Sequence, residues 1–447
     1  MSQLFSSMSQ WLSGKPRSTQ GDVVAALDIG SSKIACFISR TDDQGQLRVT
    51  GIGHQLAEGM RGGMVADMEA VQRAVSAAVA TAEQMAGENI ERVIVNVAGS
   101  QLLSQTVGVE LPLHGREITS SDLERVLAQG QTMVEEDAQG HMLEPIHTIP
   151  VNYTLDGQKG VRDPAGMIGN LLQAQLHLVS AAFGPVRTLV TAVARCHLEV
   201  EKLVAAPYAS GLACLVEDEM DLGCTLIDMG AGTTSFSIFF DGHMIYADGI
   251  PVGGTHITND IARGLTTTLA HAERLKTLYG SAISGPMDER EIIDVPQVGE
   301  EAPEHANHVP KSHLISIIQP RLEEIFEMVR AKLDKSGMGE AAGRRVVLTG
   351  GSSQMPGIRE TAQRMLDKQV RLGRPLRIAR PYLPSARTSV TAFTGLAEAT
   401  SGPAFATTAG LLAVAAQPEL LASGHSLFDH GGSGMLARAG QWVKQNL

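Results

Sequence analysis

Near the middle of the chain, an acidic residue, glycines and hydroxyl groups follow one another in a way that suits phosphate binding. Residues 224–240 form an apolar run that ends in Asp228, passes through a glycine-rich turn and continues as a second run. Glycines permit backbone angles closed to other residues and leave no Cβ in the way, so main-chain N–H groups and threonine hydroxyls can reach phosphate oxygens. Asp228 is placed to hold a metal through water. The predicted phosphate contacts are Gly230, Gly232, Thr233 and Thr234.

A second copy of this pattern lies near the N-terminus. Residues 23–38 again contain an apolar run, an acidic residue (Asp28), a glycine and small hydroxyl residues before another apolar run. One such hairpin is weak evidence, because most glycine-rich turns only reverse the chain. Two copies about two hundred positions apart indicate two similar halves that face one another. The predicted phosphate contacts here are Gly30, Ser31, Ser32 and Lys33.

Three later stretches can contribute to the same site. Residues 345–358 are typical of a strand that runs into two glycines and then a helix, so the backbone there can pass close to a flat ring or a ribose. Another glycine pair precedes a helix whose N-terminus favours an anion. Glu273 and Lys276 lie three positions apart on one predicted helix face, where a surface ion pair worth ~0.3 kcal/mol is the simplest explanation. The glycines and the adjoining serine are Gly253, Gly254, Gly350, Gly351 and Ser352.

In this order and spacing, the glycine-containing stretches resemble the two phosphate loops and the adenosine loop of the actin-like ATPase superfamily. The resemblance implies an α/β, actin-like (ribonuclease H-like) two-domain ATPase fold with ATP and Mg²⁺ in the cleft between the domains. It also implies that Asp28 and Asp228 hold Mg²⁺ through water, and that Glu273 and Lys276 reach the ribose and the edge of the adenine. The other common route to ATP, the P-loop consensus G-x-x-x-x-G-K-[ST], is absent from the sequence.

The segment between the two predicted domains bears on hydrolysis. Residues 197–211 read as a helix that ends near Gly211. In actin, the corresponding segment supplies a glutamine that orients the attacking water. This chain has Glu199 and Glu201 around that point and no glutamine. We therefore expect weak or no ATPase activity, with no catalytic residue beyond these two weak candidates.

The first predicted domain is interrupted at Gly87, where the composition changes. A strand, a capped helix and a further strand follow, which indicate a small α+β module. On its own this module predicts only protein contact, because no cluster of His, Cys or acidic residues in it suggests a reaction. An SHS2-like α+β insertion in domain one is a feature of the FtsA family of bacterial cell-division proteins, which this chain resembles within the superfamily.

The C-terminal residues 435–447 have the pattern of an amphipathic helix behind a Gly-rich tether. Its apolar side carries Trp442, and its charged residues are all basic, although the protein as a whole is acidic. Such a helix suits an anionic membrane surface; the alternative is a helix docked on the body or on a partner. FtsA-like proteins end in this arrangement. The predicted membrane residues are Met435, Leu436, Arg438, Ala439, Trp442, Val443, Lys444 and Leu447.

Composition indicates the compartment in which the protein lies and the partners that it can bind. The 447 residues are 43% apolar, and the formal net charge of −12 argues against general affinity for nucleic acid. Four widely spaced cysteines indicate free thiols in a reducing compartment. No apolar run reaches the ~18 residues of a membrane span and no leader peptide opens the chain, so we expect a cytoplasmic protein. The three histidines within residues 305–313 match no compact metal site.

The resemblance to FtsA implies an actin-like ATP-binding protein that polymerises and anchors the FtsZ ring to the inner membrane. It would lie at the division site, as a peripheral protein on the cytoplasmic face of the inner membrane. Its partners would be FtsZ through subdomain 2B, other copies of itself, anionic lipid and other division proteins through the inserted subdomain 1C. The alternatives are a pilus-type actin-like scaffold and a small-molecule kinase of the same fold, for which no base flanked by sugar-contacting residues is evident.

These expectations divide the chain into consecutive parts. They are a flexible leader (1–20, alternatively a small membrane-touching helix), domain 1A (21–86 and 169–212), inserted subdomain 1C (87–168), domain 2A (213–264 and 344–395), subdomain 2B (265–343), a helix that returns to 1A (396–416), a flexible tether (417–434) and the amphipathic helix (435–447).

Overall fold

The computed structural model describes residues 23–41, 47–133, 140–299, 307–375 and 400–415. The predicted leader, tether and terminal helix lie outside these residues. No helix among the described residues is long and apolar enough to cross a membrane. The four cysteines are free thiols, three of them buried and Cys196 half-buried.

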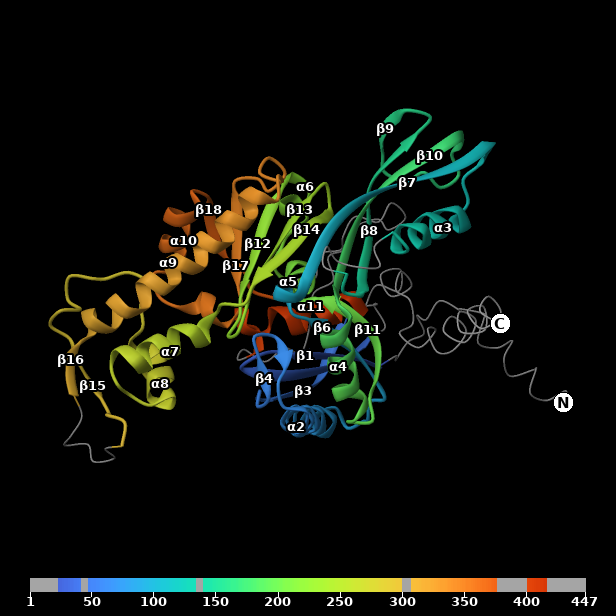
Figure 1. Cartoon of the computed structure of the whole chain (residues 1–447). Coiled ribbons are helices and arrows are strands. Elements are labelled where there is room, and N and C mark those ends of the chain that lie inside the picture. Colours follow the sequence, from blue (N-terminus) through green and yellow to red (C-terminus); the bar gives the residue numbers. More distant parts are fainter. Residues whose placement is uncertain (1–22, 42–46, 134–139, 300–306, 376–399, 416–447) are drawn as a thin grey trace, which may run out of the picture.

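Two five-stranded sheets of the same topology form the body of the molecule (Figure 1). In each, three antiparallel strands from one stretch of chain are extended by two parallel strands. The predicted pair of similar halves is therefore present. The first sheet, in spatial order, contains β11 (Glu199–Ala205), β6 (Arg92–Val97), β1 (Val23–Ile29), β2 (Lys33–Thr41) and β3 (Leu47–Leu56). The second contains β14 (His243–Ile250), β13 (Thr234–Phe240), β12 (Cys224–Met229), β17 (Arg345–Thr349) and β18 (Gln369–Leu372).

Helices cover the first sheet and join the halves. The Ala-rich helix α2 (Met68–Ala86) is capped by Asp67 and ends at Gly87 with φ 75°. Helices α5 (Ala206–Cys214) and α11 (Ala406–Ala415) are almost wholly buried between the sheets. The predicted helix over 197–211 is wrong in its first half, because residues 199–205 pair with β6 as strand β11, in which Glu199 and Glu201 are exposed and the other residues are buried.

The second half carries a separate helical layer. Its long helix α9 (Lys311–Lys335) buries one face against the second sheet. The acidic stretch before α9 contains a short hairpin. The remaining elements are α6 (Glu217–Leu222), α7 (Gly254–Gly264), α8 (Leu269–Tyr279), β15 (Ile292–Val295), β16 (Asn307–Pro310), η3 (Gly351–Gln354), α10 (Ile358–Leu366) and η5 (Pro403–Phe405).

The inserted module forms its own four-stranded sheet with a separate core (Figure 1). Figure 1 shows it at the opposite end of the molecule from β15 and β16. It follows η1 (Gly99–Gln101) and contains β7 (Leu102–Glu117), α3 (Ser120–Gln131), β8 (Leu143–Leu155), β9 (Gln158–Val161) and β10 (Ile168–Ala182), after which α4 (Phe183–Ala194) returns to the first half.

Two expected boundaries of the insertion, 87 and 168, need correction. Strand β6 belongs to the first sheet, where it pairs with β1 and β11, although it lies after residue 87. Strand β10 pairs with β7 and β8 and is therefore part of the inserted sheet, although it lies after residue 168. Strand membership depends on pairing partners far along the chain, which composition does not reveal. The inserted sheet therefore spans residues 102–182.

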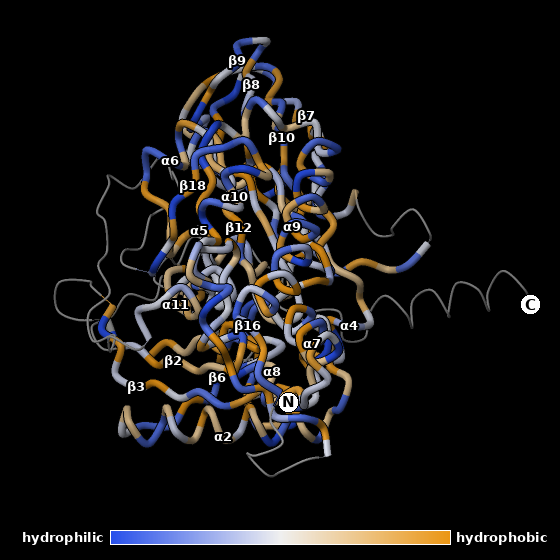
Figure 2. The backbone as a smooth tube through the Cα atoms, turned by 90° about the vertical axis from the view of Figure 1, so that its left-hand side faces the viewer, coloured by the Kyte–Doolittle hydropathy of each residue, from blue (hydrophilic) through white to orange (hydrophobic). Residues whose placement is uncertain are grey.

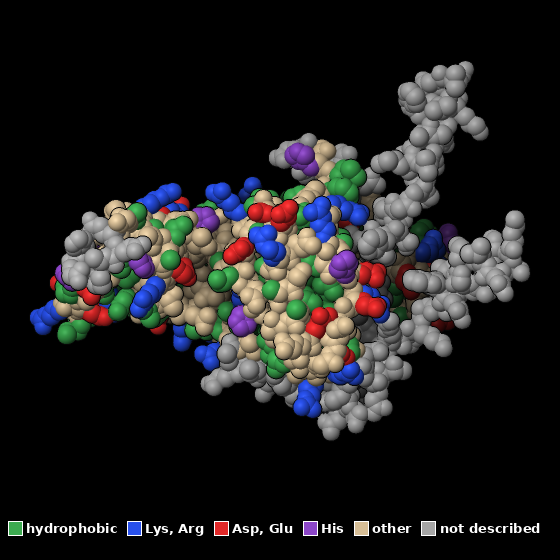
Figure 3. Space-filling model, turned by 90° about the horizontal axis from the view of Figure 1, so that it is seen from below, with side chains coloured by type: hydrophobic (Ala, Val, Ile, Leu, Met, Phe, Trp, Pro, Cys, Tyr) green, Lys and Arg blue, Asp and Glu red, His purple; other side chains and the backbone are tan. Residues whose placement is uncertain are grey.

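Hydropathy follows this architecture. Figure 2 shows hydrophobic residues along the central strands of the body and more hydrophilic residues toward β9, at the tip of the insertion. On the face seen from below, acidic and basic side chains are interspersed (Figure 3).

Candidate functional site

A cleft of about 350 Å³ lies between the two halves. Both Asp-Gly hairpins line it, together with the loop after β17, the start of α7, one side of α8 and the segment 403–407. The sequence-predicted residues among its walls are Asp28, Gly30, Ser31, Ser32, Lys33, Asp228, Gly230, Gly232, Thr233, Gly254, Glu273, Lys276, Gly350, Gly351 and Ser352.

The two hairpins have the same turn geometry. In the first, the Gly30 N–H donates to the Lys33 carbonyl over 3.0 Å, and in the second the Gly230 N–H donates to the Thr233 carbonyl over 2.9 Å. None of the hairpin glycines has a positive φ. They are needed for close approach, because a Cβ on Gly232 would lie 2.4 Å from Ser31 Oγ. Of the two reasons that the sequence offered for glycine here, only the steric one applies.

The two aspartates are buried at corresponding strand ends. Asp28 accepts a hydrogen bond from Thr408 over 3.0 Å, and Asp228 accepts from Ser210 over 2.5 Å and from Thr407 over 3.0 Å. Burial raises the pKa of Asp28 to about 6, although the charge of Lys33 opposes the shift. Burial also raises the pKa of Asp228, which its two hydroxyl partners partly offset. The site thus holds two carboxylates whose charge is poorly solvated.

Lys33 is the cation closest to this pair. Its Nζ donates to the Ala404 carbonyl and lies 3.5 Å from the centroid of the Phe405 ring. Burial lowers the pKa of Lys33, against the opposing effect of the two aspartates. The ammonium is therefore directed toward η5 in this structure.

The loop after β17 is fixed to the second hairpin. Gly350 adopts φ 86° and ψ 164°, and a Cβ there would lie 2.4 Å from Asp228 Oδ1. Ser352 Oγ donates to the Gly230 carbonyl over 3.1 Å. This loop, unlike the two hairpins, does require a glycine for its backbone angles.

Glu273 and Lys276 form an ion pair on α8, with Nζ and Oε2 2.7 Å apart. Lys276 also donates to the Gly254 carbonyl over 3.1 Å and to Thr258 Oγ1 over 2.8 Å. Thr258 Oγ1 in turn lies 2.5 Å from the same Glu273 oxygen. These bonds hold both side chains against α7, so the pair is part of the cleft wall, although the Glu273 side chain is still 55% exposed.

Four predicted residues do not line the cleft. The buried Thr234 hydroxyl donates to the Val252 carbonyl, over 2.9 Å, and so does not face the cleft. Gly253 caps α7 from behind the second hairpin. Glu199 and Glu201 are exposed on β11, in the strand that replaces the predicted helix, so the structure brings neither to the cleft.

Sequence reasoning missed several residues that line the cleft. Asn96, at the end of β6, accepts a hydrogen bond from the Ile29 N–H over 2.7 Å and so holds the first hairpin in place. Its signal was available, because it stands near the carboxyl end of a strand as the two aspartates do. Others had no local signal. They include Ala98, Gly99, Ala206, Thr277, Pro403, Ala404 and Thr407.

Two similar α/β halves around a shared cleft, with a small α+β module inserted in the first, define an actin-like fold. A solved structure, the PilM-PilN type IV pilus biogenesis complex, contains a chain of the same fold. The superposition has a TM-score of 0.60 and covers 88% of this chain and 98% of that chain, at 16% sequence identity. At this identity the similarity concerns the fold alone.

Sequence comparisons identify the family. The family model for Cell division protein FtsA matches residues 225–410, and the model for the SHS2 domain inserted in FtsA matches residues 99–180. FtsA of Rhizobium meliloti (strain 1021) is 40% identical over 443 residues, covering 96% of each chain. FtsA of Pseudomonas aeruginosa is 33% identical (95% of this chain, 98% of the relative), and that of Escherichia coli (strain K12) is 30% identical (96% and 97%). The chain belongs to the FtsA family of cell division proteins.

This membership confirms the resemblance to FtsA and the fold class. The matched SHS2 segment, 99–180, agrees with the inserted sheet rather than with the expected boundaries 87 and 168.

Proposed function

We propose that the chain is an ATP-binding scaffold of cell division that polymerises and attaches the FtsZ ring to the inner membrane. The cleft supports the nucleotide-binding part of this proposal. Two glycine hairpins of matching geometry face each other there, with no room for a Cβ at their point of contact, and a buried carboxylate stands behind each. Main-chain N–H groups without side chains around them are suited to phosphate oxygens.

The residues present fit a nucleotide with Mg²⁺. Gly30, Ser31, Ser32 and Lys33 would hold phosphates from the first half, and Gly230, Gly232 and Thr233 from the second; Glu273, Lys276 and residues 350–352 would contact the nucleoside. Mg²⁺ would supply positive charge beside the phosphates. Asp28 and Asp228 would hold it through water, and this would favour their ionised forms, which burial disfavours.

The proposed role of the nucleotide is to set a conformation rather than to be consumed. Among the described residues that line the cleft, carboxylates come only from Asp28, Asp228 and Glu273, and none is a glutamine. Glu273 is held by Lys276 and Thr258. This set supports weak or no ATPase activity, because a base beside the attacking water is needed for efficient hydrolysis.

Calorimetric titration tests the nucleotide site. ATP with Mg²⁺ should bind the full-length protein, and Asp228→Asn should weaken the Mg²⁺-dependent part of that affinity at least tenfold, since a carboxylate facing the metal is lost. Asp218→Asn, an exposed aspartate at the start of α6, is the matched control and should bind as the wild type does. Equal affinities for all three proteins would contradict the assignment of the cleft.

The proposed membrane anchor is the C-terminal segment, residues 435–447. These residues follow a Gly-rich stretch. Their pattern has an apolar stripe that contains Trp442, and their only charged side chains are Arg438 and Lys444. One such helix binds weakly, and a filament that presents many copies raises their effective concentration. Removal of residues 435–447 should release the protein from anionic liposomes in a sedimentation assay while ATP binding persists. Unchanged sedimentation with lipid would refute this part.

Contact with FtsZ is proposed for subdomain 2B, residues 265–343. Large apolar side chains exposed on this subdomain support a role in protein contact. They include Leu269, Leu278, Ile283, Met287, Ile292 and Val298. Other division proteins would dock on the inserted subdomain.

Co-sedimentation with FtsZ polymers tests this contact. Met287→Asp, on the 63% exposed Met287, should reduce the fraction recovered with FtsZ. Met85→Asp, on a 58% exposed methionine of α2 in the first half, should not. Equal recovery of both variants would exclude this region of 2B as the contact.

A further inference from the structure

The inserted subdomain begins at the wall of the cleft. The chain leaves the first sheet at the end of β6 and enters the insertion through η1 (Gly99–Gln101), which we call the root. Ala98 and Gly99 both line the cleft. The insertion therefore starts where the phosphate end of a nucleotide is proposed to lie, although its sheet extends away from that point (Figure 1).

A short turn connects the root to the first phosphate hairpin. This turn, residues 59–65, contains the two-residue strands β4 (Met60–Arg61) and β5 (Met64–Val65). The Gly63 N–H donates to Ser31 Oγ over 3.1 Å, and Gln101 Nε2 donates to the Gly63 carbonyl over 2.6 Å. Two hydrogen bonds in series thus link the hairpin, the turn and the root.

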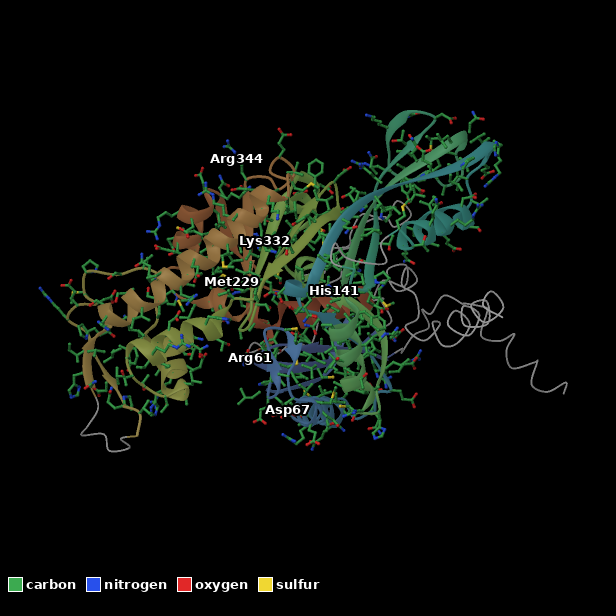
Figure 4. The ribbon with its side chains drawn as sticks, in the orientation of Figure 1. Arg61, Asp67, His141, Met229, Lys332 and Arg344 are labelled. Atoms are coloured by element: carbon green, nitrogen blue, oxygen red, sulfur yellow. The ribbon has the colours of Figure 1, made fainter. Side chains whose placement is uncertain are left out.

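The turn also touches the second hairpin. A Cβ on Gly63 would lie 2.5 Å from Ala98 Cβ and 3.4 Å from Thr233 Cγ2. A Cβ on Gly232 would lie 3.3 Å from the Cα of Gly62. In Figure 4, Arg61 lies at the side of the first half that faces α7 and α8. The turn is therefore held where the two halves meet.

The root is also packed against the second half. A Cβ on Gly99 would lie 2.1 Å from Ser235 Cβ on β13, and a Cβ on Gly249 of β14 would lie 2.7 Å from the carbonyl carbon of Gly99. Backbone contact this close transmits displacement directly, because packed interiors deform little. Ser235 follows the second phosphate hairpin by two residues, so both hairpins are in mechanical contact with the root.

Above the root, the inserted strands are bonded to both halves. His177 Nδ1 lies 2.8 Å from the Met244 carbonyl of β14, and the Ala247 N–H donates to Ser104 Oγ over 3.1 Å. His147 Nε2 accepts from the Ala205 N–H of β11 over 2.9 Å. The insertion therefore bridges the two halves, and a change in the angle between them must move it relative to at least one.

We infer that the root transmits the state of the phosphate hairpins to the inserted subdomain, with Gln101 as the positioning residue. The inserted subdomain would then be reoriented when nucleotide draws the two hairpins together. This inference rests on the proposed nucleotide site and adds to it a direction of signalling, from the cleft to the inserted sheet.

Distance measurements between spin labels test this coupling on the full-length protein. Cysteines replace Ala80 on α2 and Lys159 on β9, both exposed, in a Cys196→Ser background that removes the half-buried native thiol. Adding ATP with Mg²⁺ should shift the mean distance between the two labels. Nucleotide binding is measured separately on the same protein.

The decisive variant is Gln101→Glu, which keeps the shape of the side chain and removes the N–H that donates to Gly63. It should abolish the nucleotide-dependent shift, while affinity for ATP falls by no more than about fivefold, the equivalent of one neutral hydrogen bond of about 1 kcal/mol. Gln105→Glu, an exposed glutamine on β7, is the matched control and should keep the shift.

Each outcome has one meaning. A shift lost only in Gln101→Glu supports the inference, provided that its thermal unfolding midpoint matches that of Gln105→Glu. Nucleotide binding without any shift in the unsubstituted, doubly labelled protein, or a shift that persists in Gln101→Glu, overturns the inference and leaves the proposed function intact. Absence of nucleotide binding in that same protein would instead contradict the proposed function.

Discussion

At the scale of single residues, the cleft contains buried carboxylates that lower the stability of the folded protein. Asp28 and Asp228 are buried with only hydroxyl donors and Lys33 to compensate them. A buried carboxylate is more stable in its protonated form, so each aspartate destabilises the nucleotide-free protein near neutral pH. Ionisable groups whose pKa is shifted by burial are typical of binding sites.

The pH dependence of stability should therefore change in Asp28→Asn. The pKa of this carboxyl rises from 3.8 to about 6 on folding, so its contribution to the free energy of unfolding falls as the pH rises from about 4 to 6 and is constant above that. The loss amounts to about 3 kcal/mol at one pKa unit per 1.36 kcal/mol. In thermal unfolding without nucleotide, the stability of the variant relative to the wild type should rise between about pH 4 and pH 6 and stay constant above that. A constant difference would show that Asp28 ionises as freely in the folded state as in the unfolded one.

Gly350→Ala should strongly lower the free energy of unfolding. Its φ and ψ of 86° and 164° lie in a region that is open to glycine alone, and the added methyl would also meet Asp228 and the Met229 carbonyl at 2.4 and 2.6 Å. We expect the free energy of unfolding to fall by about 3 kcal/mol and ATP binding to weaken. Gly351→Ala, where the nearest atom is 4.0 Å away, is the control for denaturant unfolding. Similar midpoints for both variants would contradict this account.

At the scale of elements, two buried helices connect the halves and carry the partners of the aspartates. Ser210 belongs to α5, while Thr407 and Thr408 belong to α11. The helices cross at Gly410, where a Cβ would lie 1.8 Å from the Ala209 carbonyl oxygen. The crossing thus sets the position of the hydroxyls that bind both carboxylates.

Gly410→Ala should force the helices apart. The clash is with backbone, which cannot rotate away, so a loss of about 3 kcal/mol or more is expected in the free energy of unfolding, together with weaker ATP binding. Gly184→Ala in α4, where no atom lies within 4 Å, should be neutral or stabilise by up to ~1 kcal/mol. Circular dichroism during denaturant unfolding measures both. A Gly410→Ala protein as stable as Gly184→Ala would mean that the helices have room to separate.

At the scale of the whole molecule, the proposal couples assembly to membrane attachment. The body has an interdomain cleft, whereas the proposed anchor lies at the end of the chain, in residues 435–447. Many weak anchors on one polymer bind cooperatively, so lipid binding should depend on whatever controls polymerisation.

Liposome sedimentation should therefore respond to nucleotide, lipid charge and salt. Full-length protein with ATP should bind anionic vesicles with a steeper dependence on protein concentration than without ATP, and high salt should weaken binding by screening Arg438 and Lys444. Trp442→Ala should reduce binding strongly, whereas Gln441→Ala, on the polar side of the pattern, should not. Binding that ignores both lipid charge and Trp442 would refute an amphipathic anchor.

Features that depend on neighbouring residues could be predicted from the amino-acid sequence. It predicted both Asp-Gly hairpins and the loop around Gly350, because strand and turn signals act over a few positions. It also identified the family. The resemblance to the superfamily predicted that Glu273 and Lys276 lie at the nucleotide site, and both residues line the cleft.

Features that depend on contacts between distant parts of the chain became evident from the folded structure. Whether residues 199–205 become strand or helix is settled by pairing with β6, and the limits of the insertion are settled by the partners of β10. Likewise, Asp28 meets Thr408, 380 positions away, and Lys33 meets Ala404, 371 positions away. The physical reason is that pairing, burial and hydrogen bonding act through space, whereas patterns in a sequence report only on local geometry.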